Sequence, residues 1–158
     1  MCYFFTYRDM TRKYCGLILG FIIMIAILPV TTKAQNQTAV QNKQIIFIEN
    51  DFNEALKQAA AQNKYLFVDA YASWCGPCKL LKSTTFKNKK AAEFYNANFI
   101  NVAIDMEKGQ GPELAAQWGM QAYPTLIIFN PEGKPVLGSV GFIKADDLIK
   151  FGEAGLKK

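Results

Sequence analysis

Residues 65–79 read YLFVDAYASWCGPCK, the most informative segment of this 158-residue chain. A compact apolar run, Tyr65–Tyr71, comes first, and its length and composition predict a buried central strand. Two cysteines with two residues between them, Cys75 and Cys78, follow after a short connection and open a helical pattern. A Cys-x-x-Cys motif between a strand and a helix is the sequence context of redox-active cysteines.

The apolar pattern on both sides of this segment predicts alternating strands and helices between residues 44 and 158. The expected strands cover Ile45–Ile48, Tyr65–Tyr71, Phe99–Asp105, Thr125–Phe129 and Val136–Val140. The expected helices cover Phe52–Gln62, a stretch from Trp74 to about Phe86, Lys89–Ala97, Glu113–Trp118 and Lys144–Leu156. With the two consecutive helical pieces counted as one, the order is βαβαβαββα. This order predicts one α/β domain with a mixed central sheet and helices on both faces.

The cysteine pair has three uses to consider: a metal site, a structural disulfide and redox chemistry. Structural zinc needs four ligands, and the chain has neither a histidine nor a second cysteine pair of this spacing, so one chain cannot close such a site, although acidic side chains or a dimer could supply ligands. The absence of histidine also excludes Cys–His and Ser–His nucleophilic pairs. A purely structural disulfide across so short a loop removes little entropy from the unfolded chain. We therefore expect a redox disulfide, Cys75–Cys78, and no metal or cofactor.

The order of the two cysteines along the helix predicts their roles. Cys75 precedes the first helical turn, where free backbone N–H groups and the helix dipole stabilise a thiolate, so it is the expected nucleophile. Cys78 lies one turn deeper and should be less exposed. It is the expected resolving thiol, which attacks the mixed disulfide at Cys75. Pro77 is tolerated between them because the first helical turn needs no intrahelical donor.

Asp69 carries the only charge in residues 65–72. An ionised carboxylate in a buried strand is costly, so the sequence predicts a raised pKa for Asp69. We expect this side chain to carry a proton for Cys78. The alternative is an aspartate at the end of the strand that faces solvent.

Residues 68–79, VDAYASWCGPCK, resemble the active-site segment of thioredoxins. Tyr123-Pro124-Thr125 resembles the cis-proline loop of that family, and Gly141 matches a glycine after its last strand. The resemblance covers about residues 45–156 and implies a thioredoxin fold that performs dithiol–disulfide exchange. It also implies a cis Tyr123–Pro124 bond that faces the disulfide. The implied substrate groove consists of Trp74, Gly76, Pro77, Tyr123 and Pro124. Packing of Trp74 in the core is the alternative.

Two positions differ from the usual thioredoxin pattern. Asn101 stands where the family places a lysine near the buried aspartate, which leaves the charge partner of Asp69 open. Ser83 stands where a proline usually kinks the active-site helix. The segment from Ser83 to Asp105 is more similar to the extracytoplasmic branch of the family. That branch includes the C-terminal periplasmic domain of the transmembrane thiol:disulfide interchange protein.

The first 34 residues have the pattern of an export signal. Basic residues precede an uncharged run with an apolar centre at Leu17–Leu28, and a polar tail ends at Ala34. We expect a signal peptide over residues 1–34, or an uncleaved N-terminal anchor, followed by a flexible lead-in over residues 35–43. Removal of four basic groups and one acidic group lowers the net charge from +5 to +2. We therefore expect no nucleic-acid partner, and a membrane partner only if the segment is uncleaved.

The expected function is that of an exported thiol–disulfide oxidoreductase in the periplasm or another extracytoplasmic compartment. The Cys-Gly-Pro-Cys motif resembles that of reducing family members. The expected partners are therefore disulfide-containing protein substrates and a membrane or periplasmic electron donor. A disulfide oxidase or isomerase and a non-catalytic binding module are the alternatives.

Overall fold

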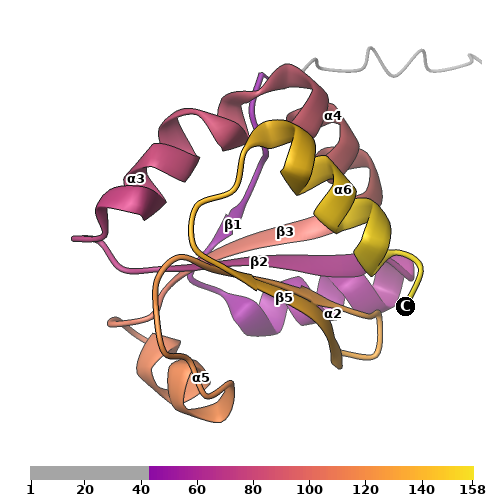
Figure 1. Ribbon diagram of the computed structural model, residues 1–158. Helices are drawn as coiled ribbons and strands as arrows, with labels where there is room; N and C mark the ends of the chain where they lie inside the picture. The colour runs from indigo at the N-terminus through magenta and orange to yellow at the C-terminus, as the bar shows by residue number, and fades with distance from the viewer. Residues whose placement is uncertain (1–42) are drawn as a thin grey trace, which may run out of the picture. The chain divides into compact units, whose positions relative to one another are not determined.

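The computed structural model describes residues 43–158, so the expected signal peptide and nearly all of the expected lead-in lie outside the described residues. The described residues form a mixed sheet with the strand order β1-β3-β2-β4-β5 (Figure 1). The strands are β1 (Ile48–Glu49), β2 (Tyr65–Tyr71), β3 (Phe99–Asp105), β4 (Thr125–Phe129) and β5 (Pro135–Val140). β1 and β2 run parallel to β3, whereas β4 is antiparallel to β2 and β5. The predicted mixed α/β sheet is confirmed.

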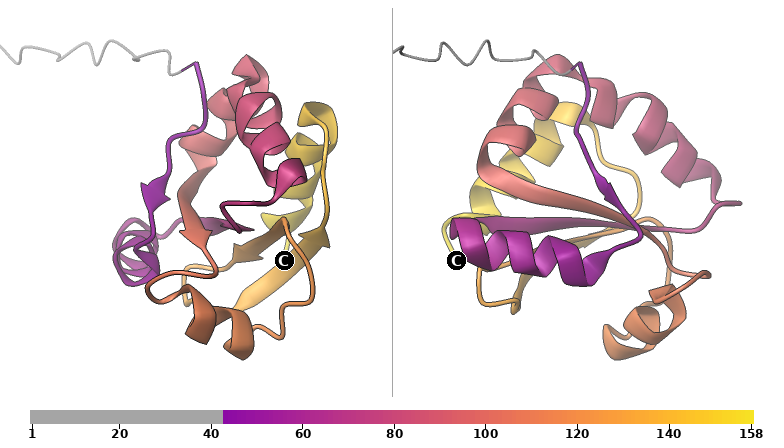
Figure 2. Two further views of the ribbon diagram at one scale, coloured as in Figure 1. Left: turned by 90° about the vertical axis from the view of Figure 1, so that its left-hand side faces the viewer. Right: turned by 180° about the vertical axis from the view of Figure 1, so that it is seen from behind.

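Helices cover both faces of this sheet, with α3, α4 and α6 on one face and α2 and α5 on the other (Figures 1 and 2). Their bounds are α2 (Phe52–Gln62), α3 (Gly76–Ser83), α4 (Lys89–Asn98), α5 (Gly111–Gln117) and α6 (Ala145–Gly155). Side chains alternate along β2, as they do in any strand. Leu66 and Val68 join the apolar cluster on the α2 face, and Phe67 joins the cluster on the α3 face. Asp69 therefore faces the α3 side.

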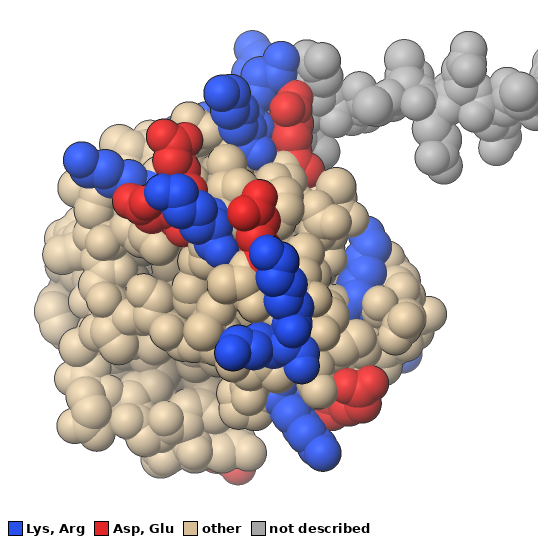
Figure 3. All heavy atoms as spheres, turned by 45° about the vertical axis from the view of Figure 1, so that its right-hand side comes forward, with Lys and Arg blue, Asp and Glu red and all other residues tan. Residues whose placement is uncertain are grey.

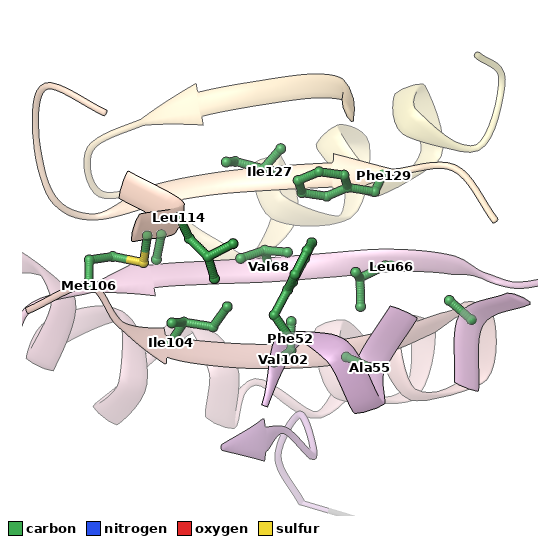
Figure 4. Packing of buried hydrophobic residues seen from close by; sticks show 12 residues of the cluster. Phe52, Ala55, Leu66, Val68, Val102, Ile104, Met106, Leu114, Ile127 and Phe129 are labelled. Carbon is green, nitrogen blue, oxygen red and sulfur yellow. The ribbon is translucent and has the colours of Figure 1, made fainter. Parts of the chain in front are cut away.

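The apolar cluster on the α2 face of the sheet packs against β2. The ring of Phe52 in α2 lies 5.0 Å from the ring of Trp118 and 5.5 Å from that of Phe129. Leu114 of α5 and Val68 of β2 converge on the same cluster (Figure 4). Each fully buried Leu or Phe side chain contributes about 1.5–3 kcal/mol. This packing holds β2, and with it Asp69, in a fixed position.

β1 is shorter than predicted and covers only the end of the expected strand Ile45–Ile48. The N–H of Ile45 donates to the carbonyl oxygen of Phe86 at 2.8 Å. The N–H of Ile46 donates to Asn96 Oδ1 at 2.9 Å. Because these donors are bound to the helical layer, the segment does not join the strand ladder until its last residue.

The helix predicted to continue to about Phe86 ends at Ser83. Ser83 Oγ and Thr84 Oγ1 both donate to the carbonyl oxygen of Leu80, at 3.2 and 2.6 Å. Hydroxyl groups that bind a carbonyl in this way compete with continuation of the helix. The chain proceeds instead as the short 3-10 helix η1, Thr85–Lys87. The other helices and strands lie within two residues of their predicted bounds.

Charged side chains are interleaved in sign on the face of the molecule shown in Figure 3. Exposed pairs include Lys89 with Glu93 at 3.8 Å and Lys150 with Asp147 at 3.2 Å. Such pairs contribute about 0–1 kcal/mol each, so they are features of a solvated surface rather than of a strong electrostatic field. Within residues 43–158, none of the helices has the length and apolarity needed to cross a membrane.

Candidate active site

The two cysteines lie where β2 passes into α3. They form a disulfide with an S–S distance of 2.02 Å and a Cα–Cα distance of 5.3 Å. Cys75 is the N-cap of α3, and its Sγ accepts a hydrogen bond from the backbone N–H of Cys78 at 3.1 Å. Pro77 lies in the first turn, where its missing N–H costs nothing. In the reduced form, the same N–H and the helix dipole would stabilise a thiolate at Cys75.

The expected difference in exposure between the two cysteines is wrong for this oxidised state. Cys75 is 2% exposed and Cys78 is 5% exposed. Tyr71 and Tyr123 pack against the small cluster that both cysteines form with Ala72, so both residues are almost fully covered. The distinction between the cysteines therefore rests on their positions in the backbone. Cys75 caps the helix, and Cys78 lies within its first turn.

Asp69 is buried, with 2% of its surface exposed, so the alternative of a solvent-facing aspartate is wrong. Its Oδ1 atom has no hydrogen-bond partner among the described residues. Burial raises the pKa of Asp69 from 3.8 to about 7, the nearby positive charge of Lys82 opposes this rise, and the negative charge of Glu49 adds to it. The carboxyl group is therefore poised to exchange a proton near neutral pH.

Asn101 does not face Asp69 in the sheet. In the register of β2 and β3, Asn101 pairs with Phe67, whereas Asp69 pairs with Ala103. The Asn101 amide donates to the carbonyl oxygen of Ile46 at 3.2 Å. It thus ties β3 to the segment before β1, and the charged groups that act on Asp69 come from elsewhere.

Trp74 and the loop before β4 flank the disulfide. The Tyr123–Pro124 bond is cis, as the resemblance implies. The backbone N–H of Gly141, which has a φ of +94° that suits glycine, donates to the carbonyl oxygen of Pro124 at 2.8 Å. Trp74 is 66% exposed, so the alternative of core packing is wrong. Its ring lies edge-on to that of Tyr123, with 6.2 Å between the centroids.

Glu107 is a site residue that the sequence analysis missed. The indole N–H of Trp74 donates to both carboxylate oxygens of Glu107, at 2.9 Å each. The two residues are 33 positions apart, and Glu107 lies in the turn after β3. A single acid in a polar turn carries no sequence signal for this contact, which arises only when β3 packs beside β2.

The Glu107 contact predicts that this carboxylate orders the Trp74 side chain. In Glu107→Ala, the indole N–H loses an acceptor worth about 1 kcal/mol at an exposed site, so Trp74 should sample several rotamers. Nitrogen-15 relaxation of the indole N–H groups measures this directly. Trp118, packed against Phe52 and Phe129, is an internal reference. Glu107→Gln, which keeps an acceptor, should stay ordered, and an equally rigid Trp74 in Glu107→Ala would refute the prediction.

A redox disulfide at a helix N-terminus, a buried aspartate in the preceding strand and a cis-proline loop define a dithiol–disulfide exchange protein. Residues 52–156 match the thioredoxin-like domain family, and the chain belongs to that family. It is 40% identical over 86 residues to a thioredoxin from Chlamydia trachomatis, a match that covers 54% of this chain and 78% of the relative.

Two further similarities extend the comparison. The chain is 29% identical over 102 residues to the thiol:disulfide interchange protein DsbD of Campylobacter jejuni, but the match covers 64% of this chain and only 18% of that protein. The solution structure of a candidate disulphide-isomerase from Bacteroides thetaiotaomicron superposes with a TM-score of 0.65 and 43% identity. That match covers 73% of this chain and 95% of the other. With its Cys75–Cys78 pair, the chain is a thiol–disulfide oxidoreductase of the thioredoxin type, a class that acts on disulfide-containing substrates.

Proposed function

We propose that this oxidoreductase is exported and reduces disulfides in periplasmic or other extracytoplasmic proteins. The observation that carries the proposal is the Cys-Gly-Pro-Cys disulfide at the N-terminus of α3, in a chain whose first 34 residues have the pattern of an export signal. The similarity of this domain to part of the thiol:disulfide interchange protein DsbD supports a role in thiol–disulfide exchange. The electrons would come from a membrane or periplasmic dithiol protein, since cytosolic reductases do not reach that compartment.

The exchange begins at Cys75. Its thiolate attacks one sulfur of a substrate disulfide, so that a bond forms between Cys75 and the substrate while the substrate S–S bond breaks. The departing substrate sulfur leaves as a thiolate and takes a proton from water. The helix N-terminus favours this first step because it stabilises the attacking thiolate.

Cys78 and Asp69 complete the exchange. The Asp69 carboxylate accepts the proton of the Cys78 thiol, and the resulting thiolate attacks the sulfur of Cys75. The Cys75–Cys78 bond forms, and the second substrate sulfur leaves as a thiolate. Two electrons have then passed from the dithiol to the substrate, and a donor dithiol must reduce the new disulfide. The buried position of Asp69 supports its role as the base.

The groove beside the disulfide would hold an extended segment of the substrate. Trp74 and Tyr123 supply aromatic surface beside the disulfide, with their rings edge-on to each other, and the buried Pro124 sits at the cis bond. Gly76 and Pro77 are exposed, and a methyl group added at Gly76 would meet no atom within 4 Å. The backbone at this point is therefore open to a substrate chain.

Trapping of the mixed disulfide tests both the compartment of the protein and the direction of the exchange. The full chain with Cys78→Ser is expressed in a Gram-negative bacterium, where the first attack can occur but its resolution cannot. We expect the protein in the periplasmic fraction, joined to envelope proteins by disulfides that a reductant releases. The variant that lacks both cysteines is the matched control. Recovery only from the cytoplasm would refute export, and an absence of adducts would refute the reducing role.

Isomerisation is a second candidate, favoured by the similarity to the candidate disulphide-isomerase from Bacteroides thetaiotaomicron. An isomerase rearranges incorrect disulfides without net reduction, whereas a reductase consumes donor electrons with each turnover. Refolding of a protein with scrambled disulfides separates the two functions. Recovery of native disulfides without consumption of the donor would favour the isomerase.

A further inference from the structure

Glu49 stands in the same row of the sheet as Asp69. The register pairs Asp69 of β2 with Ala103 of β3, and the same Ala103 with Glu49 of β1. Residues paired in this way project to the same face, and neighbouring strands lie about 4.8 Å apart. The two acidic side chains therefore leave the sheet about 10 Å apart, with only the methyl group of Ala103 between them.

Lys82 extends from α3 toward the row that contains Glu49, Ala103 and Asp69. It lies in the last turn of α3, and its Nζ is 3.6 Å from Glu49 Oε1. The same Nζ lies 5.2 Å from the centre of the Tyr71 ring, and Tyr71 is the next residue after Asp69 on that side of β2. Two contacts thus fix Lys82 over the part of the sheet in which Asp69 is buried.

The Lys82–Glu49 ion pair is about half exposed to solvent. The side chains of Lys82 and Glu49 are 52% and 50% exposed, and both line a surface cavity of about 560 Å³ between the segment before β1 and α3. Their charges are partly screened there, so each acts on Asp69 as a moderate rather than a dominant influence. The same exposure means that either side chain can be replaced without opening the core.

We propose that Glu49 and Lys82 are positioning residues that set the proton affinity of Asp69 by placing a pair of opposite charges beside the part of the sheet in which it is buried. The inference rests on the proton-carrying role of Asp69 in the proposed function. It assigns to Lys82 of α3 and Glu49 of β1 the influence on Asp69 that thioredoxins usually assign to a lysine at the position of Asn101. Lys82 favours the ionised carboxylate, and Glu49 favours the protonated acid.

The other groups that face Asp69 are uncharged or already neutralised, so the assignment of its charge partners falls on Glu49 and Lys82. On β2 the neighbouring group is the Tyr71 phenol, and on β4 the residue opposite is the apolar Leu126. On β3 the nearest acid is Asp105, opposite Tyr71, and Lys108 neutralises it at 2.8 Å. Besides Lys82, α3 and its N-cap contribute only the Cys75–Cys78 disulfide among the groups that face Asp69.

Substitutions of Lys82 and Glu49 should shift the pKa of Asp69 in opposite directions. In Lys82→Met, the remaining Glu49 charge should raise the pKa of Asp69 by about half a unit. In Glu49→Gln, the unpaired Lys82 should lower it by about the same amount. Carbon-13 NMR of the labelled aspartate carboxyl groups measures the titration in the full chain. Lys87→Met, at another lysine that lines the cavity, is the matched control and should leave Asp69 unchanged.

The direction of the shifts separates electrostatics from structural damage. Damage would move both variants the same way, whereas the double variant Lys82→Met with Glu49→Gln should return close to the wild type. Shifts of the same sign, or no shift in either variant, would overturn the inference. The pH midpoint of insulin disulfide reduction should follow the Asp69 titration. If the titration shifts as expected and this midpoint does not, the inference stands and the proton-carrying role of Asp69 fails.

Discussion

Replacement of Cys75 by serine should lower the rate of protein disulfide reduction more than about a thousandfold, as expected when a covalent nucleophile is removed. A serine hydroxyl is a far weaker nucleophile at neutral pH, and it forms no mixed disulfide with the substrate. Insulin reduction with dithiothreitol as the donor measures this loss. Ser73→Ala, at an exposed neighbour outside the cysteine pair, is the matched control and should reduce insulin at the wild-type rate.

Replacement of Cys78 by serine should block the second step of the exchange instead of the first. The Cys75 thiolate remains at the N-cap of α3, so the first attack proceeds and a mixed disulfide accumulates, while turnover stops. Mass spectrometry of the protein after incubation with an oxidised peptide detects this adduct on Cys75. Rapid turnover by Cys75→Ser, or an adduct on Cys78 in that variant, would reverse the roles assigned to the two cysteines.

Local sequence patterns predicted the framework of the site because each pattern has a local cause. The apolar run Tyr65–Tyr71 forms the central strand with the expected bounds, and Cys75 lies at the start of the following helix, as expected. The burial of Asp69 also followed from its position inside that run. These features depend on neighbouring residues, so the sequence contains them.

Contacts between distant elements could not be predicted in this way. The hydrogen bond from Trp74 to Glu107 and the ion pair of Lys82 with Glu49 form only when packing of the whole core has set the register of β1, β3 and β2. The early part of the expected first strand was lost for the same reason, because Asn96 of α4 binds the N–H of Ile46. Side-chain partners from another layer of the fold decided these details.

The free energy of unfolding of the oxidised protein should fall by about 3 kcal/mol between pH 4 and pH 7 because of Asp69. Burial raises its pKa from 3.8 in the unfolded chain to about 7 in the folded protein. The folded state therefore binds the proton more tightly. Stability from this group is fully present below the unfolded pKa of 3.8 and is lost as the pH rises through the folded pKa of about 7. Each unit of difference in pKa is worth about 1.4 kcal/mol.

Urea unfolding of the wild type and of Asp69→Asn, at intervals from pH 4 to pH 8.5, measures this contribution. Other carboxyl groups titrate in both proteins, so the difference between the two curves isolates Asp69. Asp146→Asn, at an exposed acid in α6, should run parallel to the wild type. Parallel curves for Asp69→Asn would show that the folded protein does not hold this proton. A sloping difference would mean that the fold gives up stability near neutral pH to keep a buried base half ionised, at the pH where that base transfers protons best.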